Sequence, residues 1–393
     1  MIKKLKTYTL CLVFLSSLFL CAAEPNSVIA TITVGDTPSA VAVTPNNLYA
    51  YVTNNNNDSI LNGDTVSVLN LTYNTLETTI SDMSFSGPYT VTINASGTKA
   101  YVTNSNSTTV SIIDLATNTV TGIISGFSGP TGFAITPDGT TAYVNNYGYG
   151  GGSGSGTTVN VVDLNTNMIV GESLTVGQAP AALAITPDGA YVYVVSYVDG
   201  TIDGGTISII DTSDNSVNLN AITGLSGPFA IAITPNGEYA YVTNFGSNNF
   251  IPVGTTVSVI DISTNTIVDT ITLGLQPAGI AITPDGSTAY VSNYSTVYQN
   301  ADSNPPLISS QGTINSIDIN TNSVTSQIIG GIGLAPGGIT ISPNGQFAYV
   351  TNYGSNTVSI IALPTTFYNI NRLRPHYNLQ QDETITKLTE SAL

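Results

Sequence analysis

The chain has 393 residues, of which 24 are Asp or Glu and 7 are Lys or Arg, and its formal net charge is −17 at pH 7. Between residues 25 and 363, Lys99 is the only Lys or Arg against twenty acids. A surface this acidic repels phosphate groups, so nucleic acid and anionic lipid are poor candidate partners.

Residues 1–23 have the pattern of a secretory signal peptide. Three lysines within the first six residues precede an apolar stretch at 10–20, which is too short to span a bilayer, and small residues follow at 22–23. We expect cleavage before Glu24. A lipoprotein signal at Cys21 is the alternative, although Leu20 stands where a small residue is usual. Both cysteines lie in this segment, so the mature chain is expected to fold without disulfides. No later run of about eighteen apolar residues occurs in the sequence, so no transmembrane segment is expected in the mature chain.

A fifteen-residue pattern recurs along the rest of the chain. Copies begin at residues 40, 90, 132, 182, 230, 279 and 338, with spacings of 42 to 59 residues, and the copy at 230–244 reads AIAITPNGEYAYVTN. Each copy predicts a β-hairpin, because a short aliphatic run and a Tyr-Val run flank a Pro-Asp-Gly or Pro-Asn-Gly turn. A recurrence of this length is typical of repeat architectures.

One complete unit spans residues 226–274. It contains four runs of strand character, at 230–233, 239–243, 256–260 and 266–273, separated by turn residues. Four antiparallel strands per repeat predict the blade of a β-propeller. The sequence therefore predicts an all-β fold, with residues 24–363 forming one domain: a seven-bladed propeller of four-stranded antiparallel blades.

Small and large residues alternate in the innermost strands. In the first repeat Ala40 and Ala42 alternate with Val41 and Val43, and the other repeats follow the same order. Because blades converge toward an axis, we expect the slim face of one blade to pack against the bulky face of the next.

The two ends of the repeat region complement each other. Residues 28–34 form a fourth strand before the first hairpin, whereas the seventh unit stops after its third strand at 357–362. We predict that the N-terminal strand completes the last blade and closes the ring, which leaves no open sheet edge.

The motifs TPDG or TPNG followed by AYVTN, with the later TVSVID-x-x-TNT, give the chain a family resemblance over residues 27–363. It resembles the YVTN-repeat β-propeller proteins of bacteria and archaea. This resemblance implies a secreted, periplasmic or surface protein, surface-layer proteins included, and no single activity. The fourth repeat departs with Val194-Val195-Ser196, and the second has Asn94-Ala95-Ser96-Gly97 at its turn. The architecture also resembles that of propeller lactonases and a streptogramin lyase, whose central pockets hold His, Arg or acidic clusters.

Propeller topology assigns the loops to two faces. The lower face carries the turns between strands one and two and between strands three and four; the upper face carries the loops between strands two and three and the links between blades. Half of the acids fall in lower-face turns, and we expect those in the turns between strands three and four to cap backbone N–H groups. Asp36 is the only ionisable residue in the links, and the sole histidine, His376, lies in the tail. We therefore predict no catalytic residues.

The upper-face loops of repeats three to six are rich in aromatic residues. The candidate partner-binding residues are Tyr147, Tyr149, Tyr197, Phe245, Phe250, Tyr294 and Tyr298. Aromatic rings among Asn and Gly suit a glycan or a protein epitope. The alternative is that these rings pack their own long loops.

Evidence for a metal in the sequence is confined to a few oxygen ligands. Asp199 and Asp203, in VDGTIDGG, are candidate ligands for Ca²⁺, although turn formation explains them equally well. No other cofactor is expected.

Together these features predict a secreted, non-catalytic propeller that presents its upper-face loops to a protein or glycan at the periplasm or cell surface. Two alternatives stay open: an enzyme of the lactonase or lyase type, and a structural surface-layer component. In the tail, residues 364–393, we hypothesise that Arg372, Arg374 and His376 lie against the acidic lower rim; a loosely ordered terminus is the other interpretation.

Overall fold

The structure is a computed structural model that describes residues 24–55, 64–148, 154–197, 204–246, 253–294, 298–299, 307–308, 312–328 and 330–364. The chain divides into two compact units, 1–363 and 364–393, and the description below concerns the first. The expected signal peptide and the basic residues of the tail lie outside the described residues.

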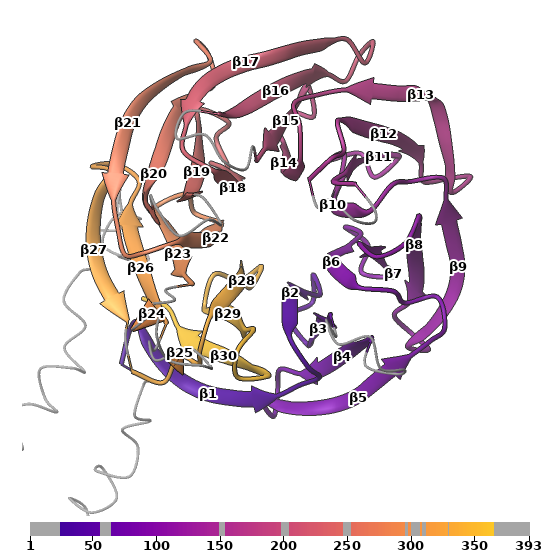
Figure 1. Cartoon of the computed structure of the whole chain (residues 1–393). Coiled ribbons are helices and arrows are strands. Elements are labelled where there is room, and N and C mark those ends of the chain that lie inside the picture. The colour runs from indigo at the N-terminus through magenta and orange to yellow at the C-terminus, as the bar shows by residue number, and fades with distance from the viewer. Residues whose placement is uncertain are drawn as a thin grey trace, which may run out of the picture. The chain divides into compact units, whose positions relative to one another are not determined.

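The first unit is a ring of seven four-stranded antiparallel blades, as predicted (Figure 1). From the axis outward, blades 1 to 3 consist of β2 (Pro38–Val43), β3 (Tyr49–Asn54), β4 (Thr65–Asn70) and β5 (Thr75–Ser81); β6 (Pro88–Ile93), β7 (Lys99–Asn104), β8 (Thr109–Asp114) and β9 (Thr119–Ser125); and β10 (Pro130–Ile135), β11 (Thr141–Asn146), β12 (Thr158–Asp163) and β13 (Met168–Thr175).

Blades 4 to 6 consist of β14 (Pro180–Ile185), β15 (Tyr191–Ser196), β16 (Gly205–Asp211) and β17 (Val217–Leu225); β18 (Pro228–Ile233), β19 (Tyr239–Gly246), β20 (Val253–Asp261) and β21 (Thr266–Thr272); and β22 (Pro277–Ile282), β23 (Thr288–Asn293), β26 (Thr313–Asp318) and β27 (Ser323–Ile328). The short strands β24 (Tyr298–Gln299) and β25 (Leu307–Ile308) pair in the long loop of blade 6. Within the described ranges there is no helix of the length and apolarity needed to cross a membrane.

The seventh blade is closed by the N-terminal strand, as predicted. Its order is β28 (Pro336–Ile341), β29 (Phe347–Asn352), β30 (Thr357–Ala362) and then β1 (Ser27–Thr33). β1 runs antiparallel to β30, with Val28 opposite Ile361 and Thr33 opposite Thr357. The ring is therefore joined within one sheet by segments from both ends of the repeat region (Figure 1).

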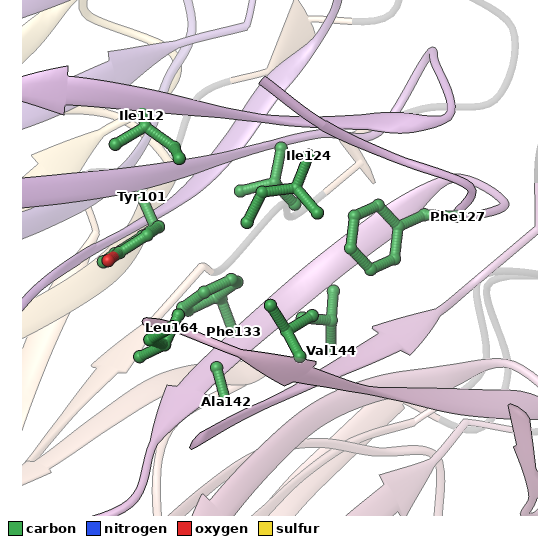
Figure 2. Packing of buried hydrophobic residues seen from close by; sticks show 10 residues of the cluster. Tyr101, Ile112, Ile124, Phe127, Phe133, Ala142, Val144 and Leu164 are labelled. Atoms are coloured by element: carbon green, nitrogen blue, oxygen red, sulfur yellow. The ribbon is translucent and has the colours of Figure 1, made fainter. Parts of the chain in front are cut away.

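The hydrophobic core consists of seven clusters, each lying between two neighbouring blades. Between blades 2 and 3, Tyr101, Ile112 and Ile124 face Phe133 and Val144 (Figure 2). The expected fit of slim against bulky faces is confirmed between blades 1 and 2: Ala40 and Ala42 pack against the cluster that contains Val91.

Two side chains of the YVTN motif also join neighbouring blades by hydrogen bonds. In blade 5, the Tyr241 hydroxyl donates to Asn322 Oδ1 of blade 6 (2.6 Å), and the Thr243 hydroxyl donates to the Ala278 carbonyl (2.8 Å). The motif's Asn bonds within its own blade, because Asn244 Nδ2 donates to Thr256 and Ser258 of the third strand (both 2.9 Å). These bonds give partners to the two hydroxyls and to Asn244 Nδ2, which burial would otherwise leave without them.

Candidate functional site

A cavity of about 560 Å³ opens at the axis of the ring. Small residues of the innermost strands make much of its wall: Ala40, Ala182, Ala230, Gly279 and Gly338. These are the slim positions of the strand pattern, and their size leaves the space that larger side chains would fill. The volume falls within the range of small-molecule sites in proteins.

Five aromatic side chains line this cavity: Tyr89, Phe229, Phe245, Tyr294 and Tyr353. They occupy two different positions of the repeat, and each position is shared by several blades. Tyr89 and Phe229 directly follow the proline that begins an innermost strand, whereas the other three directly follow the last residue of a YVTN motif or its variant. Both positions lie at the upper end of their strands, so the repeat itself places these rings around the axis.

Four of the rings form a continuous row across blades 5, 6 and 7. The ring centroids are 5.4 Å apart for Phe229 and Phe245, 6.0 Å for Phe245 and Tyr294, and 6.2 Å for Tyr294 and Tyr353. The interplanar angles are 35°, 59° and 53°, so each ring is turned relative to the one before it. We call these four residues the aromatic row. All four are half-buried and so keep part of their surface in the cavity.

Tyr89 comes from β6, across the axial opening from β18 and β22 (Figure 1). Burial raises the pKa of its hydroxyl well above the ordinary value, and the nearby Tyr147, Tyr353 and Tyr294 hydroxyls raise it further. Tyr89 is thus neutral near neutral pH: its hydroxyl donates or accepts a hydrogen bond but does not act as a base.

The structure divides the predicted partner-binding residues. Phe245 and Tyr294 line the cavity, and Tyr147 is half-buried and electrostatically near Tyr89. Tyr197 is buried, and its hydroxyl donates to the Gly246 carbonyl (2.9 Å), which gives it a structural role in joining blades 4 and 5. The positions outside the described residues are Tyr149, Phe250, Asp199 and Asp203, together with the side chain of Tyr298.

The sequence analysis did not identify Tyr89, Phe229 and Tyr353, because these cavity residues lie outside the long aromatic loops of repeats three to six. For Tyr353 the repeat register was the available signal: residues 147, 197, 245, 294 and 353 all directly follow a YVTN motif or its variant, and all are aromatic.

The lower-face carboxylates are bound to their own turns, as predicted for the turns between strands three and four. Asp114 Oδ1 accepts from the Ala116 and Thr117 amides (2.9 and 3.0 Å), and Asp138 Oδ1 accepts from the Thr140 amide (3.0 Å). A hydrogen bond from the Thr136 hydroxyl is the main cause that lowers the pKa of Asp138. These carboxylates therefore serve as turn caps. Nowhere in the described part of the chain do three or more His, Cys, Asp or Glu gather as a metal site would require.

Two further hollows lie at the lower side, between blades 4 and 5 (about 570 Å³) and between blades 5 and 6 (about 780 Å³). Their carboxylates include Asp188 and Asp285, which accept bonds from the hydroxyls of Thr186 and Thr283 in their own turns. Turn formation explains these polar linings, whereas it does not explain the aromatic row. The axial cavity is therefore the stronger candidate site.

Comparisons with known proteins agree with the architecture. A family model described as "Lactonase, 7-bladed beta-propeller" matches residues 210–376, which is less than half of the chain. No curated protein matches the sequence. Among solved structures, the chain is similar to hydrazine synthase of Kuenenia stuttgartiensis (TM-score 0.67, 19% identity, covering 88% of this chain and 98% of that one).

It is also similar to the beta-propeller domain of Cps50 (Swd1) from Myceliophteria thermophila (TM-score 0.62, 11% identity, covering 86% of this chain and 100% of that one). At these identities the likeness concerns the fold alone. The chain is thus a seven-bladed β-propeller whose second half is similar to the lactonase propellers.

Proposed function

We propose that this protein is a secreted, non-catalytic propeller that binds a partner through its axial cavity at the periplasm or cell surface. The observation that carries the proposal is the aromatic row, whose four rings stay half-exposed around one cavity. Aromatic side chains are enriched in binding sites, because they offer large contact areas at little cost in conformational entropy.

The polar chemistry of the cavity supports binding over turnover. The ionisable residues among its described lining are tyrosines, and the pKa of Tyr89 is raised by burial. Hydrolysis of an ester or lactone needs a group that takes a proton near neutral pH, or a metal that activates water. Asp36, the one acid of the links, accepts a hydrogen bond from Asn356 Nδ2 (2.7 Å). The described lining thus offers contact surface without a base.

The candidate partner classes to be tested are proteins and glycans. The test measures binding of the mature protein to a peptide library and to a set of neutral oligosaccharides, with Phe245→Ala and Tyr353→Ala beside the parent. Tyr73→Ala is the matched control, because Tyr73 is 75% exposed in a lower-face turn. We expect both cavity variants to lose at least about tenfold in affinity and the control to lose none. Equal binding by all four proteins would overturn the axial site. Cell fractionation with surface proteolysis tests the location.

A lactonase-type activity is the second candidate, favoured by the family-model match to residues 210–376. It is distinguished by assaying a panel of aliphatic and aromatic lactones with the parent protein and with Asp36→Asn and Asp64→Asn. Turnover that disappears in a folded variant would replace the binding proposal with an enzymatic one. Absence of turnover across the panel agrees with a binding protein.

A further inference from the structure

We infer that the axial cavity recognises an organic cation: an alkylammonium or quaternary ammonium group, carried by a small molecule or by the partner. The inference rests on the proposed function and names the chemical class that the cavity accepts. Three features of the structure carry it: the orientation of the rings, the distribution of charge, and the small number of polar groups in the wall.

The rings provide a surface suited to cations. The faces of Phe and Tyr carry negative electrostatic potential, and a cation within about 6 Å of a ring centroid is attracted to it. Successive rings of the aromatic row are tilted by 35° to 59°, so their surfaces point in different directions around the mouth instead of forming one flat platform. Phe229 and Phe245 have no hydrogen-bonding group and offer only their rings.

The charge around the cavity favours a cation as well. Two carboxylates are held on the upper side next to the lining. Asp64 Oδ2 accepts from the Gly87 amide (2.9 Å), two residues before Tyr89, and Asp36 lies two residues before Pro38, which lines the cavity. Their negative charge raises the local concentration of cations at the mouth.

The protein's own cations do not compete for this site in the described part of the chain. Lys99 is the only Lys or Arg there, and it begins β7 at the lower end of blade 2, paired in register with Asp114 beside a lower-face turn. Among the described residues no Lys or Arg other than Lys99 is present, while the segment from 25 to 363 carries twenty acids.

The wall is poorly suited to a neutral sugar. Recognition of a sugar needs several directional hydrogen-bond partners besides a stacking surface. Apart from its aromatic residues, the described wall is mainly alanine, glycine and isoleucine. Its polar side-chain groups are the hydroxyls of the three tyrosines and the side chains of Ser39, Asn55 and Thr90. Of these, Ser39 already donates to the Pro88 carbonyl (3.3 Å). The wall therefore favours a compact apolar cation over a polyhydroxylated ligand.

The experiment compares choline with its uncharged isostere 3,3-dimethylbutan-1-ol by titration calorimetry on the mature protein. The two probes have the same shape, so a difference in affinity reports the charge. Tyrosine fluorescence gives a second readout, because the chain has 21 Tyr and no Trp. We expect one choline site, at least about tenfold weaker binding of the isostere, and an affinity for choline that falls as salt rises.

Two variants test the rings themselves. Phe245→Leu and Tyr353→Leu keep an apolar side chain but remove the aromatic face, and each is expected to weaken choline binding by at least about fivefold. Tyr73→Leu, outside the cavity, is expected to bind like the parent, and thermal unfolding checks that all three proteins are folded.

Equal affinity for the two probes, or an unchanged choline affinity in both leucine variants, would overturn the inference. If choline fails to bind while a neutral oligosaccharide binds and is lost in the Phe245→Leu variant, the cation inference fails and the proposed binding function stands. If none of these probes binds and a lactone is turned over, both fail.

Discussion

The Tyr290 hydroxyl donates a hydrogen bond to Asn26 Oδ1 at 2.8 Å, although the two residues are 264 positions apart. Tyr290 belongs to blade 6, and Asn26 directly precedes β1, the strand that completes blade 7. The same bond links tyrosines of the second strands to asparagines of the next blade at Tyr51–Asn118, Tyr143–Asn215, Tyr193–Asn265 and Tyr241–Asn322. All five asparagines have positive φ, between 52° and 59°. In the other blades this asparagine belongs to the turn between the third and fourth strands. Blade 7 has no such turn, because β1 is its fourth strand, and Asn26 accepts the bond instead.

Replacing Asn26 is expected to weaken the closed ring. Asn26→Gly keeps the positive φ of 58° but loses the acceptor for Tyr290 and the bond from Asn26 Nδ2 to Ser326 (3.2 Å). We expect a loss of about 1–2 kcal/mol in the free energy of unfolding. Asn26→Ala is expected to cost about 1 kcal/mol more, because a residue with a Cβ is strained at this φ. Urea unfolding of both variants checks the order, and equal stability of the glycine variant and the parent would contradict it.

Removal of the closing strand is expected to be far more damaging than removal of the tail. A chain beginning at residue 35 loses every backbone pairing between β1 and β30 and removes Ile32, which is 6% exposed, from the core between blades 7 and 1. It would leave a long unpaired edge on β30, and such edges aggregate. A chain ending at residue 364 keeps all described strands and serves as the control. We expect the first to be insoluble or unfolded and the second to melt like the parent; the reverse would refute the role of β1.

Much of the fold was predictable because each repeat carries its own turn chemistry. The hairpin turns and the Asp caps are local patterns, and counting their repeats predicts the number of blades. The incomplete last unit, together with the extra strand before the first hairpin, predicts how the ring closes. The predicted boundaries differ slightly from the structure. β18 begins at Pro228 instead of residue 230, because Pro228 pairs with Asn244 at the upper end of the hairpin.

The site was less predictable because it depends on how separate blades meet. Tyr197, Phe245 and Tyr294 have the same place in their repeats, yet Tyr197 is buried with its hydroxyl on Gly246, whereas the other two line the cavity. The bonds between tyrosine and asparagine also escaped sequence analysis, since their partners are 67 to 264 residues apart. A single repeat, however regular, does not contain that information.

Stability is expected to fall on the alkaline side. Burial, as the main cause, raises the pKa to about 12 for five tyrosines of the second strands: Tyr51, Tyr193, Tyr241, Tyr290 and Tyr349. In the unfolded chain a tyrosine has a pKa of about 10. Because the folded pKa is the higher one, the contribution of these groups is complete below about pH 10 and is lost as the pH rises toward about 12. Urea midpoints measured at about pH 9 and about pH 11 should differ strongly, and equal midpoints would contradict the raised pKa values.

In blade 4 the last residue of the YVTN motif is not asparagine, and a substitution can restore it. Ser196 stands where the other blades have asparagine, and its buried Oγ has no hydrogen-bond partner. In blade 1, Asn54 Nδ2 donates to Thr65 and Ser67 (both 3.0 Å), and blade 4 has Thr206 and Ser208 at the equivalent positions.

Ser196→Asn is therefore expected to stabilise the protein by about 1 kcal/mol, because two new hydrogen bonds outweigh one buried Oδ1 without a partner, which Asn54 has as well. Blade 4 also has room for the larger side chain. In blade 1 the asparagine fits because its neighbour is Gly35, where a Cβ would collide with the Asn54 side chain. Gly177 has the equivalent place in blade 4, because its amide donates to Ser208 (3.2 Å) as the Gly35 amide does to Ser67 (3.3 Å). Ser196→Ala, which removes only the unpaired hydroxyl, is the matched control and should change stability little. An asparagine variant that melts below the alanine variant would mean that blade 4 is packed more tightly here than blade 1.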